Sequence, residues 1–165
     1  MEEKLSRLLR RGKPLKTEAE DLLKINRETA GCGLTLSRDE ALRLAQVHRN
    51  ALDECGRVEV GPGTVEKLAL AFRNSQYLDS GNFASVLAEA TEAFYALKNE
   101  SEDTIPDDEL VSLLANGFER FGGTLSAYLG SEELDRLLRA RRCGAPETEE
   151  KEEEDVPGEE DEQDE

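Results

Sequence analysis

The sequence predicts an all-α fold, a compact bundle of six to seven helices with a disordered acidic C-terminal tail. Successive segments place apolar residues three and four positions apart, the spacing that gathers them on one face of a helix. Ser, Thr, Gly and Pro stand between these segments, where helices begin and end. The stretch Arg57–Val60 alternates polar and apolar residues but has no second strand to pair with, so we interpret it as a connector.

The N-terminal part of the chain is expected to form a short amphipathic segment and then a helix. Glu3–Arg11 carries leucines on one side together with four cations. The helix is expected to begin at Thr17, because Glu20 three residues later completes a capping-box pattern, and to stop near Gly31.

The same pattern, with Ser37 and Glu40, predicts a long helix over Arg38–Cys55 that Gly56 ends. Its expected inward face is Leu42, Ala45, His48 or Arg49, and Leu52. Thr64, after a Gly-Pro-Gly turn, is expected to cap the next helix. The apolar face of that helix is Val65, Leu68, Ala69 and Phe72.

The clearest periodicity lies in two later segments, Phe83–Lys98 and Ile105–Phe121, joined by the six-residue acidic turn 99–104. The first has the apolar face Phe83, Val86, Leu87, Ala90, Phe94 and Leu97. The second has the apolar face Leu110, Leu113, Leu114, Phe118 and Phe121. A short turn between two apolar stripes predicts an antiparallel pair that carries the core. A last helical region is expected over residues 124–129 and 131–142.

The charge of the chain is concentrated at its end. The last nineteen residues, Glu147–Glu165, hold thirteen acidic side chains and one lysine, so they supply −12 of the net charge of −17. With almost no apolar side chains, this tail cannot bury enough surface to offset the entropy of ordering. The expected organisation is a basic amphipathic segment over residues 1–16, a helical domain over 17–142 and a disordered tail over 143–165.

No apolar run in the sequence has the length of a signal peptide or of a membrane helix, so we expect a soluble cytoplasmic protein. The three cysteines, Cys32, Cys55 and Cys143, are far apart and odd in number. This pattern favours reduced thiols over a disulfide framework.

The acidic turn resembles the exit of a calcium-binding EF-hand loop. In that register Glu100 and Glu102 stand at the third and fifth ligand positions and Glu109 at the last. The first position is the cation Lys98, and the sixth, where the sharp bend requires Gly, is Asp103. We therefore expect no specific metal site and no cofactor, and we interpret the carboxylates as favourable charges at the start of the following helix.

Other catalytic or nucleic-acid patterns are weak. His48 and Cys55 share a helix face, but no group that would orient the histidine is identifiable, so a packed or exposed histidine is favoured. The arginines of segment 136–142 form a basic strip without interleaved aromatic residues, on a body that is net acidic. This argues against nucleic-acid binding. The acidic tail is expected either to shield these cations or to attract a basic protein partner, whose identity the sequence does not give.

Several sequence blocks, taken together, have a recognisable order and spacing. They are Asn26–Thr29 with Gly33–Leu36, then Gly56–Glu59, Phe94-Tyr95 with Lys98–Glu100, and Asp107–Leu110 with Phe118 and Gly122-Gly123. As a set they resemble an uncharacterised family of small bacterial proteins, a domain of unknown function, over roughly Leu15–Arg142. The resemblance implies no reaction, cofactor or catalytic residue.

Polar residues inside these blocks lie at helix ends and are expected to converge. They are Arg57, Glu59, Tyr95, Lys98, Asn99 and Glu100. We expect Arg57 or Lys98 to face Glu59 or Glu100. A hydrogen-bonded network that pins the helices is favoured over a ligand site.

For the function, the sequence favours a non-enzymatic protein-interaction module with an acidic tail. One alternative is a ligand- or metal-binding helical protein that uses the Lys98–Glu109 turn. The other is an enzyme with a polar site near Arg57, Glu59 and Asn99. A shallow apolar groove would favour the module, and a converging cleft would favour the alternatives.

Deleting Glu147–Glu165 should leave helicity and melting temperature nearly unchanged, because the segment has almost no apolar surface to dock. The deletion should also weaken salt-sensitive association with basic partners. Circular dichroism melts of both forms test this. A fall in melting temperature of more than about 4 °C would mean that the tail packs on the body.

Overall fold

The computed structural model describes residues 14–59 and 61–143. These residues form helices and contain no strand, so the all-α prediction is confirmed. The predicted segment Glu3–Arg11 and the acidic tail lie outside the described residues. The elements are α2 (Leu15–Leu23), α3 (Asn26–Thr29), the 3-10 turn η1 (Ala30–Cys32), α4 (Arg38–Glu54), α5 (Gly63–Phe72), α6 (Phe83–Glu100), α7 (Asp107–Arg120), α8 (Leu125–Leu129) and α9 (Glu132–Arg142). Within this described part, seven helices have five residues or more, as the sequence predicts.

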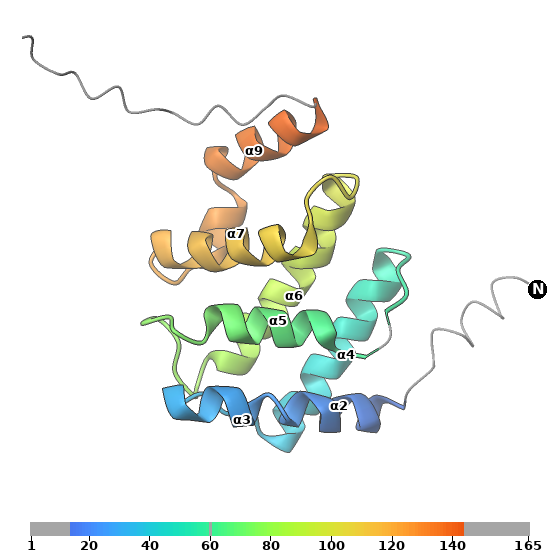
Figure 1. Cartoon of the computed structure of the whole chain (residues 1–165), viewed down its shortest axis with the longest axis vertical. Helices are drawn as coiled ribbons and strands as arrows, with labels where there is room; N and C mark the ends of the chain where they lie inside the picture. The colour runs from blue at the N-terminus through green and yellow to red at the C-terminus, as the bar shows by residue number, and fades with distance from the viewer. Residues whose placement is uncertain (1–13, 60, 144–165) are drawn as a thin grey trace, which may run out of the picture.

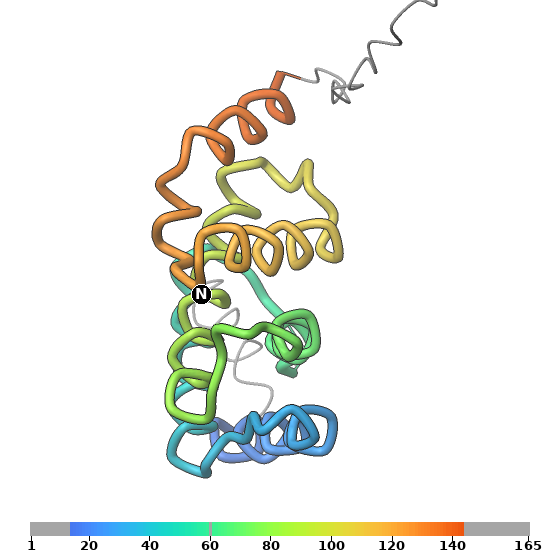
Figure 2. The backbone as a smooth tube through the Cα atoms, turned by 90° about the vertical axis from the view of Figure 1, so that its left-hand side faces the viewer, coloured from blue at the N-terminus to red at the C-terminus, as the bar shows by residue number. Residues whose placement is uncertain are grey.

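Two long helices, α4 and α6, lie side by side and form one layer. In Figure 1, α2–α3, α5 and α7 run roughly parallel to one another, one above the next, and cross this layer. The turned view of Figure 2 shows them on one side of the α4–α6 layer. The most extensive contacts join α2 to α4 and α4 to α6. The core therefore lies between the two layers.

The predicted antiparallel pairing of the Phe83–Lys98 and Ile105–Phe121 helices is wrong. Helix α7 crosses α6 instead of running back along it (Figure 1). Its apolar face also packs on α5, where the rings of Phe72 and Phe118 lie 5.3 Å apart between centroids. The reason is that the buried residues of α6 extend beyond one stripe and include Ala93 and Tyr95. Helix α6 is thus central, with neighbours on more than one side.

Helix starts follow the predicted caps in one case and not in two others. The capping box of α4 is confirmed, since Ser37 and Glu40 exchange bonds of 3.2 and 2.9 Å. Helix α2 starts at Leu15, so Thr17 lies in its first turn, where its N–H donates to the Pro14 carbonyl. Helix α5 starts at Gly63, so Thr64 is also inside the helix and its hydroxyl serves another purpose.

The junction of α7 and α8 depends on a glycine. A Cβ at Gly117 would overlap the ring of Tyr128, which is 2% exposed and cannot move into solvent. Only a residue without a side chain lets these two elements approach so closely.

Gly117→Ala should lower the free energy of unfolding by about 1–3 kcal/mol, because the clash outweighs the better helix propensity of Ala. Chemical denaturation measures this. Gly63→Ala is the matched control, since a Cβ there meets no atom within 4 Å. Equal stability of Gly117→Ala and the parent would contradict the packing described.

Candidate functional site

A charged histidine lies buried between the two layers. His48 is 1% exposed and follows Leu44 on the inward face of α4, with Leu52 one turn further along the helix. Its Nδ1 donates to Glu18 of α2, and its Nε2 donates to the hydroxyl of Tyr95 at 3.1 Å. The Tyr95 hydroxyl itself donates to Glu59. The tyrosine proton is therefore already used, and both ring nitrogens of His48 must carry hydrogens, which makes the ring an imidazolium.

The surrounding carboxylates account for that charge. Burial alone would lower the pKa of His48, but hydrogen bonds and charge from Glu18 and Glu59 raise it to about 9. Burial would likewise raise the pKa of Glu18, but His48 and then Arg49 hold it below its usual value. Arg49 donates to the second Glu18 oxygen at 3.0 Å. Two acids and two cations thus form a balanced cluster inside the protein.

Glu59 links this cluster to the start of α5. One of its oxygens accepts from the hydroxyl of Thr64 at 2.8 Å and from the Thr64 N–H at 3.2 Å, and the other accepts from Tyr95. Burial would raise the pKa of Glu59, but the bonds from His48, Tyr95 and Thr64 lower it to about 2. Burial and the Glu59 contact raise the pKa of Tyr95. Glu59 therefore caps α5 and closes the network, which we call the histidine cluster: Glu18, His48, Arg49, Glu59, Thr64 and Tyr95.

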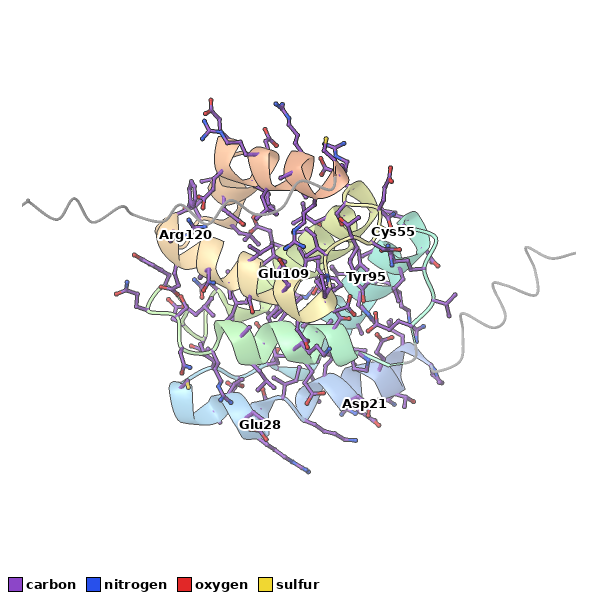
Figure 3. The ribbon with its side chains drawn as sticks, turned by 45° about the horizontal axis from the view of Figure 1, so that its top comes forward. Asp21, Glu28, Cys55, Tyr95, Glu109 and Arg120 are labelled. Carbon is purple, nitrogen blue, oxygen red and sulfur yellow. The ribbon has the colours of Figure 1, made fainter. Side chains whose placement is uncertain are left out.

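A pocket of about 570 Å³ opens beside the histidine cluster. We call it the connector pocket, because residues 57–59 between α4 and α5 form one side of it. Its polar wall is Arg57, Glu59, Thr64, Lys67, Tyr95 and Lys98. Its apolar wall is Leu52, Val58, Gly63 and Phe94, and Asp107 of α7 completes the lining. In the view of Figure 3, buried Tyr95 lies below Cys55, which stands at the end of α4. The cluster forms part of the pocket wall through Glu59, Thr64 and Tyr95.

Three cations line the pocket, and each is paired with an acid from one short stretch, residues 103–108, which we call the acidic segment. The pairs are Arg57 with Asp103, Lys98 with Asp107 at 2.6 Å, and Lys67 with Asp108 at 3.1 Å. Lys98 also donates to the carbonyl of Ile105 at 2.8 Å. These contacts tie the turn between α6 and α7 to the pocket rim.

Comparison with known proteins places the chain in a family. A model described as a family of unknown function (DUF6323) matches residues 21–147, well over half of the chain. The chain belongs to this family. No match was found among curated proteins or among solved structures. Because the family brings no reaction, the function has to be argued from the geometry of the site. Along the described part of the chain, no helix is both long and apolar enough to cross a bilayer.

Four of the six polar residues singled out in the sequence line the connector pocket: Arg57, Glu59, Tyr95 and Lys98. Asn99 lies outside it and accepts from Arg57 at 2.9 Å. Glu100 is exposed and does not line the pocket. Arg57 and Lys98 pair with Asp103 and Asp107 instead of Glu59 or Glu100. The reason is that Glu59 is already paired with His48, a residue that the sequence did not place in this group.

The histidine cluster contains residues that sequence reasoning missed. Glu18 stands one helical turn before Leu22, so it occupies an apolar position of α2, and a carboxylate there requires a buried partner. The sequence placed His48 or Arg49 on the inward face of its helix but did not connect either residue with Glu18 or Glu59. Polar residues at these two apolar positions, 18 and 48, were the available signal. Cys55, which shares a helix face with His48, is half-buried at the end of α4, and the ring nitrogens of His48 bond instead with Glu18 and Tyr95.

The three carboxylates of the calcium-loop register point to different surroundings. Glu109 pairs with Arg141 of α9, whereas Glu100 and Glu102 are exposed. Across residues 14–59 and 61–143, no three Asp, Glu, His or Cys side chains lie close enough together to hold a metal ion.

The histidine cluster should make stability depend on pH in a defined way. The folded pKa of His48, about 9, exceeds its reference value of 6.5, so its contribution is complete below pH 6.5 and is lost as pH rises toward 9. The folded pKa of Glu59, about 2, lies below 4.5, so its contribution is complete above pH 4.5 and is lost as pH falls toward 2. The contribution of the cluster is greatest between these limits.

Denaturation between pH 6.5 and 9 should show a fall in the free energy of unfolding on the order of 3 kcal/mol. His48→Gln should be less stable at pH 6 and should lose this alkaline slope. His48 is the only histidine of the chain, so no other imidazole contributes. An unchanged slope in the variant would refute the assignment.

Proposed function

We propose that this protein is a non-enzymatic binding module that holds a small polar ligand in the connector pocket. The observation that carries the proposal is the pocket itself, a cavity of about 570 Å³ lined by side chains of four helices and the connector. This volume lies within the range of about 300–1,000 Å³ that is usual for small-molecule sites. An apolar wall and a few converging polar groups are also usual for such sites.

The wall of the pocket is held rigid before any ligand arrives. Glu59 accepts three hydrogen bonds, from Tyr95 and from the side chain and N–H of Thr64. Tyr95 is 3% exposed and is further fixed by His48. Groups that are already ordered cost little entropy on binding, which supports recognition at this site.

Binding is a better reading than acid–base catalysis for the same groups. General acids and bases work best when their pKa lies near the operating pH. Here the pKa of Glu59 is about 2, that of His48 is about 9, and that of Tyr95 is raised above its usual value. These groups are suited to holding a fixed charge pattern at neutral pH.

The exposed surface supports a small ligand over a docked protein. In the described part of the chain, Val58 and Tyr77 are the large hydrophobic residues that are exposed, at 58% and 37%. They belong to different segments, so they do not build an extended apolar patch of the kind that protein partners cover. The protein-interaction function inferred from the sequence therefore depends on the acidic tail alone, and we rank it below the binding of a small ligand.

A side chain introduced at Gly63 tests the proposal. Gly63 lines the pocket, and a Cβ there meets no atom within 4 Å, so Gly63→Phe adds a large side chain at the pocket wall without a clash. Amide chemical-shift mapping of the labelled protein with a library of small polar compounds should detect binders that shift the amides of Thr64, Lys67 and Lys98. Gly63→Phe should lose them.

Gly31→Phe is the matched control. Gly31 is also exposed, has equally open surroundings and lies outside the pocket. It should keep the binders found with the parent. Binders that survive in Gly63→Phe, or a library without any binder at these amides, would overturn the proposal.

A further inference from the structure

The pairing around the connector pocket indicates what kind of ligand it takes. Each of the three pocket cations, Arg57, Lys67 and Lys98, is already matched by one carboxylate of the acidic segment. The three acids occur within six residues of sequence, while the cations come from the connector, α5 and α6. One short stretch of chain therefore supplies the carboxylate that pairs with each pocket cation.

The carboxylates are far more exposed than two of the cations that they meet. The side chain of Lys98 is 12% exposed and that of Asp107 is 52% exposed, while Arg57 is 26% exposed and Asp103 is 60% exposed. A carboxylate that is half in water loses little when it turns fully into water, and such exposed pairs contribute little to stability. An incoming anion can therefore replace these acids at small cost.

The backbone of the turn between α6 and α7 is strained, and this strain also favours its release. Glu102 and Asp103 have φ values of 53° and 59°, in the left-handed region that side chains other than Gly rarely adopt. The contacts of Arg57 and Lys98 with this turn help to hold that conformation. When Arg57 and Lys98 lose their contacts with the turn, part of the interactions that hold this strained conformation is removed.

We propose that the connector pocket binds an anionic group, with a phosphate monoester as the best match. This anion replaces Asp103, Asp107 and Asp108 as the partner of the pocket cations and so releases the turn between α6 and α7. This inference rests on the proposed binding function and names its ligand class and its regulation. The acidic segment acts as an internal competitor, which occupies the cations until a stronger anion arrives.

Charge balance favours a dianion. Once the acidic segment is displaced, three cations face the pocket together with Glu59, and the charge of Glu59 is already matched by His48. A phosphate monoester supplies about −1.5 to −2 at neutral pH and accepts several hydrogen bonds. The apolar side chains of Leu52, Val58 and Phe94 leave room for a ring or an alkyl group on the same ligand.

Titration calorimetry with phenyl phosphate, benzoate and phenol at constant ionic strength tests the ligand class. Phenyl phosphate should bind most tightly, benzoate more weakly and phenol weakest. Lys67→Gln should reduce the affinity for phenyl phosphate several-fold. Lys24 is an exposed lysine that pairs with Asp21 outside the pocket, so Lys24→Gln should leave this affinity unchanged. Phenol binding as tight as that of phenyl phosphate would overturn the inference.

Two double variants of equal charge change test the competition. Asp107→Asn with Asp108→Asn removes two of the competing carboxylates and should raise the affinity for phenyl phosphate roughly tenfold. Glu100→Gln with Glu102→Gln changes two acids that line no part of the pocket and should raise it by less than about twofold. Equal gains in both would show general electrostatics instead of an internal competitor.

Amide hydrogen exchange tests the release. Residues 101–108 should exchange faster when phenyl phosphate is bound, while α4 should not. Phosphate binding with slower or unchanged exchange in the turn would overturn the release. If phenyl phosphate does not bind, but neutral compounds bind to the parent and not to Gly63→Phe, this inference is refuted and the proposed function stands.

Discussion

The structure depends on one buried interaction, the imidazolium of His48 between the carboxylates of Glu18 and Glu59. It joins α2, α4 and the connector, and through Tyr95 it reaches α6. Buried charges are tolerated only when they are paired and hydrogen-bonded, so each partner fixes the position of the others. Helix α2 packs most extensively on α4, and the Glu18–His48 bond sets which turn of α2 faces which turn of α4.

The connector pocket follows from this cluster. Gly56, with a φ of 64°, ends α4 and turns the chain outward. Glu59 is then held by Tyr95 and Thr64, and Arg57 and Val58 line the pocket beside it. The alternation of polar and apolar residues in this connector thus serves neither a strand nor a plain loop. It places one half-buried acid in the histidine cluster and one cation on the wall of the connector pocket.

The acidic segment has a role that its composition alone does not indicate. Its carboxylates meet cations of the connector, α5 and α6. Lys98, which argues against a calcium loop, holds the turn between α6 and α7 through the Ile105 carbonyl and Asp107. The same lysine therefore connects the shape of the turn to the charge of the pocket. Glu109, one turn further along α7, pairs instead with Arg141 and holds α9.

The sequence by itself determined the helical class, the inward faces of α5 and α6, and the start of α4 at Ser37, because spacing and caps act within a few residues. It also indicated Arg57, Glu59, Tyr95 and Lys98 as polar residues near one another. Only the tertiary structure decided that α7 crosses α6, since neighbouring helices compete for the broad apolar surface of α6. Tertiary structure also decided the partners of His48 and Glu59, because Glu18 lies 30 residues from His48 and Tyr95 lies 36 residues from Glu59, so these side chains meet only when the layers close.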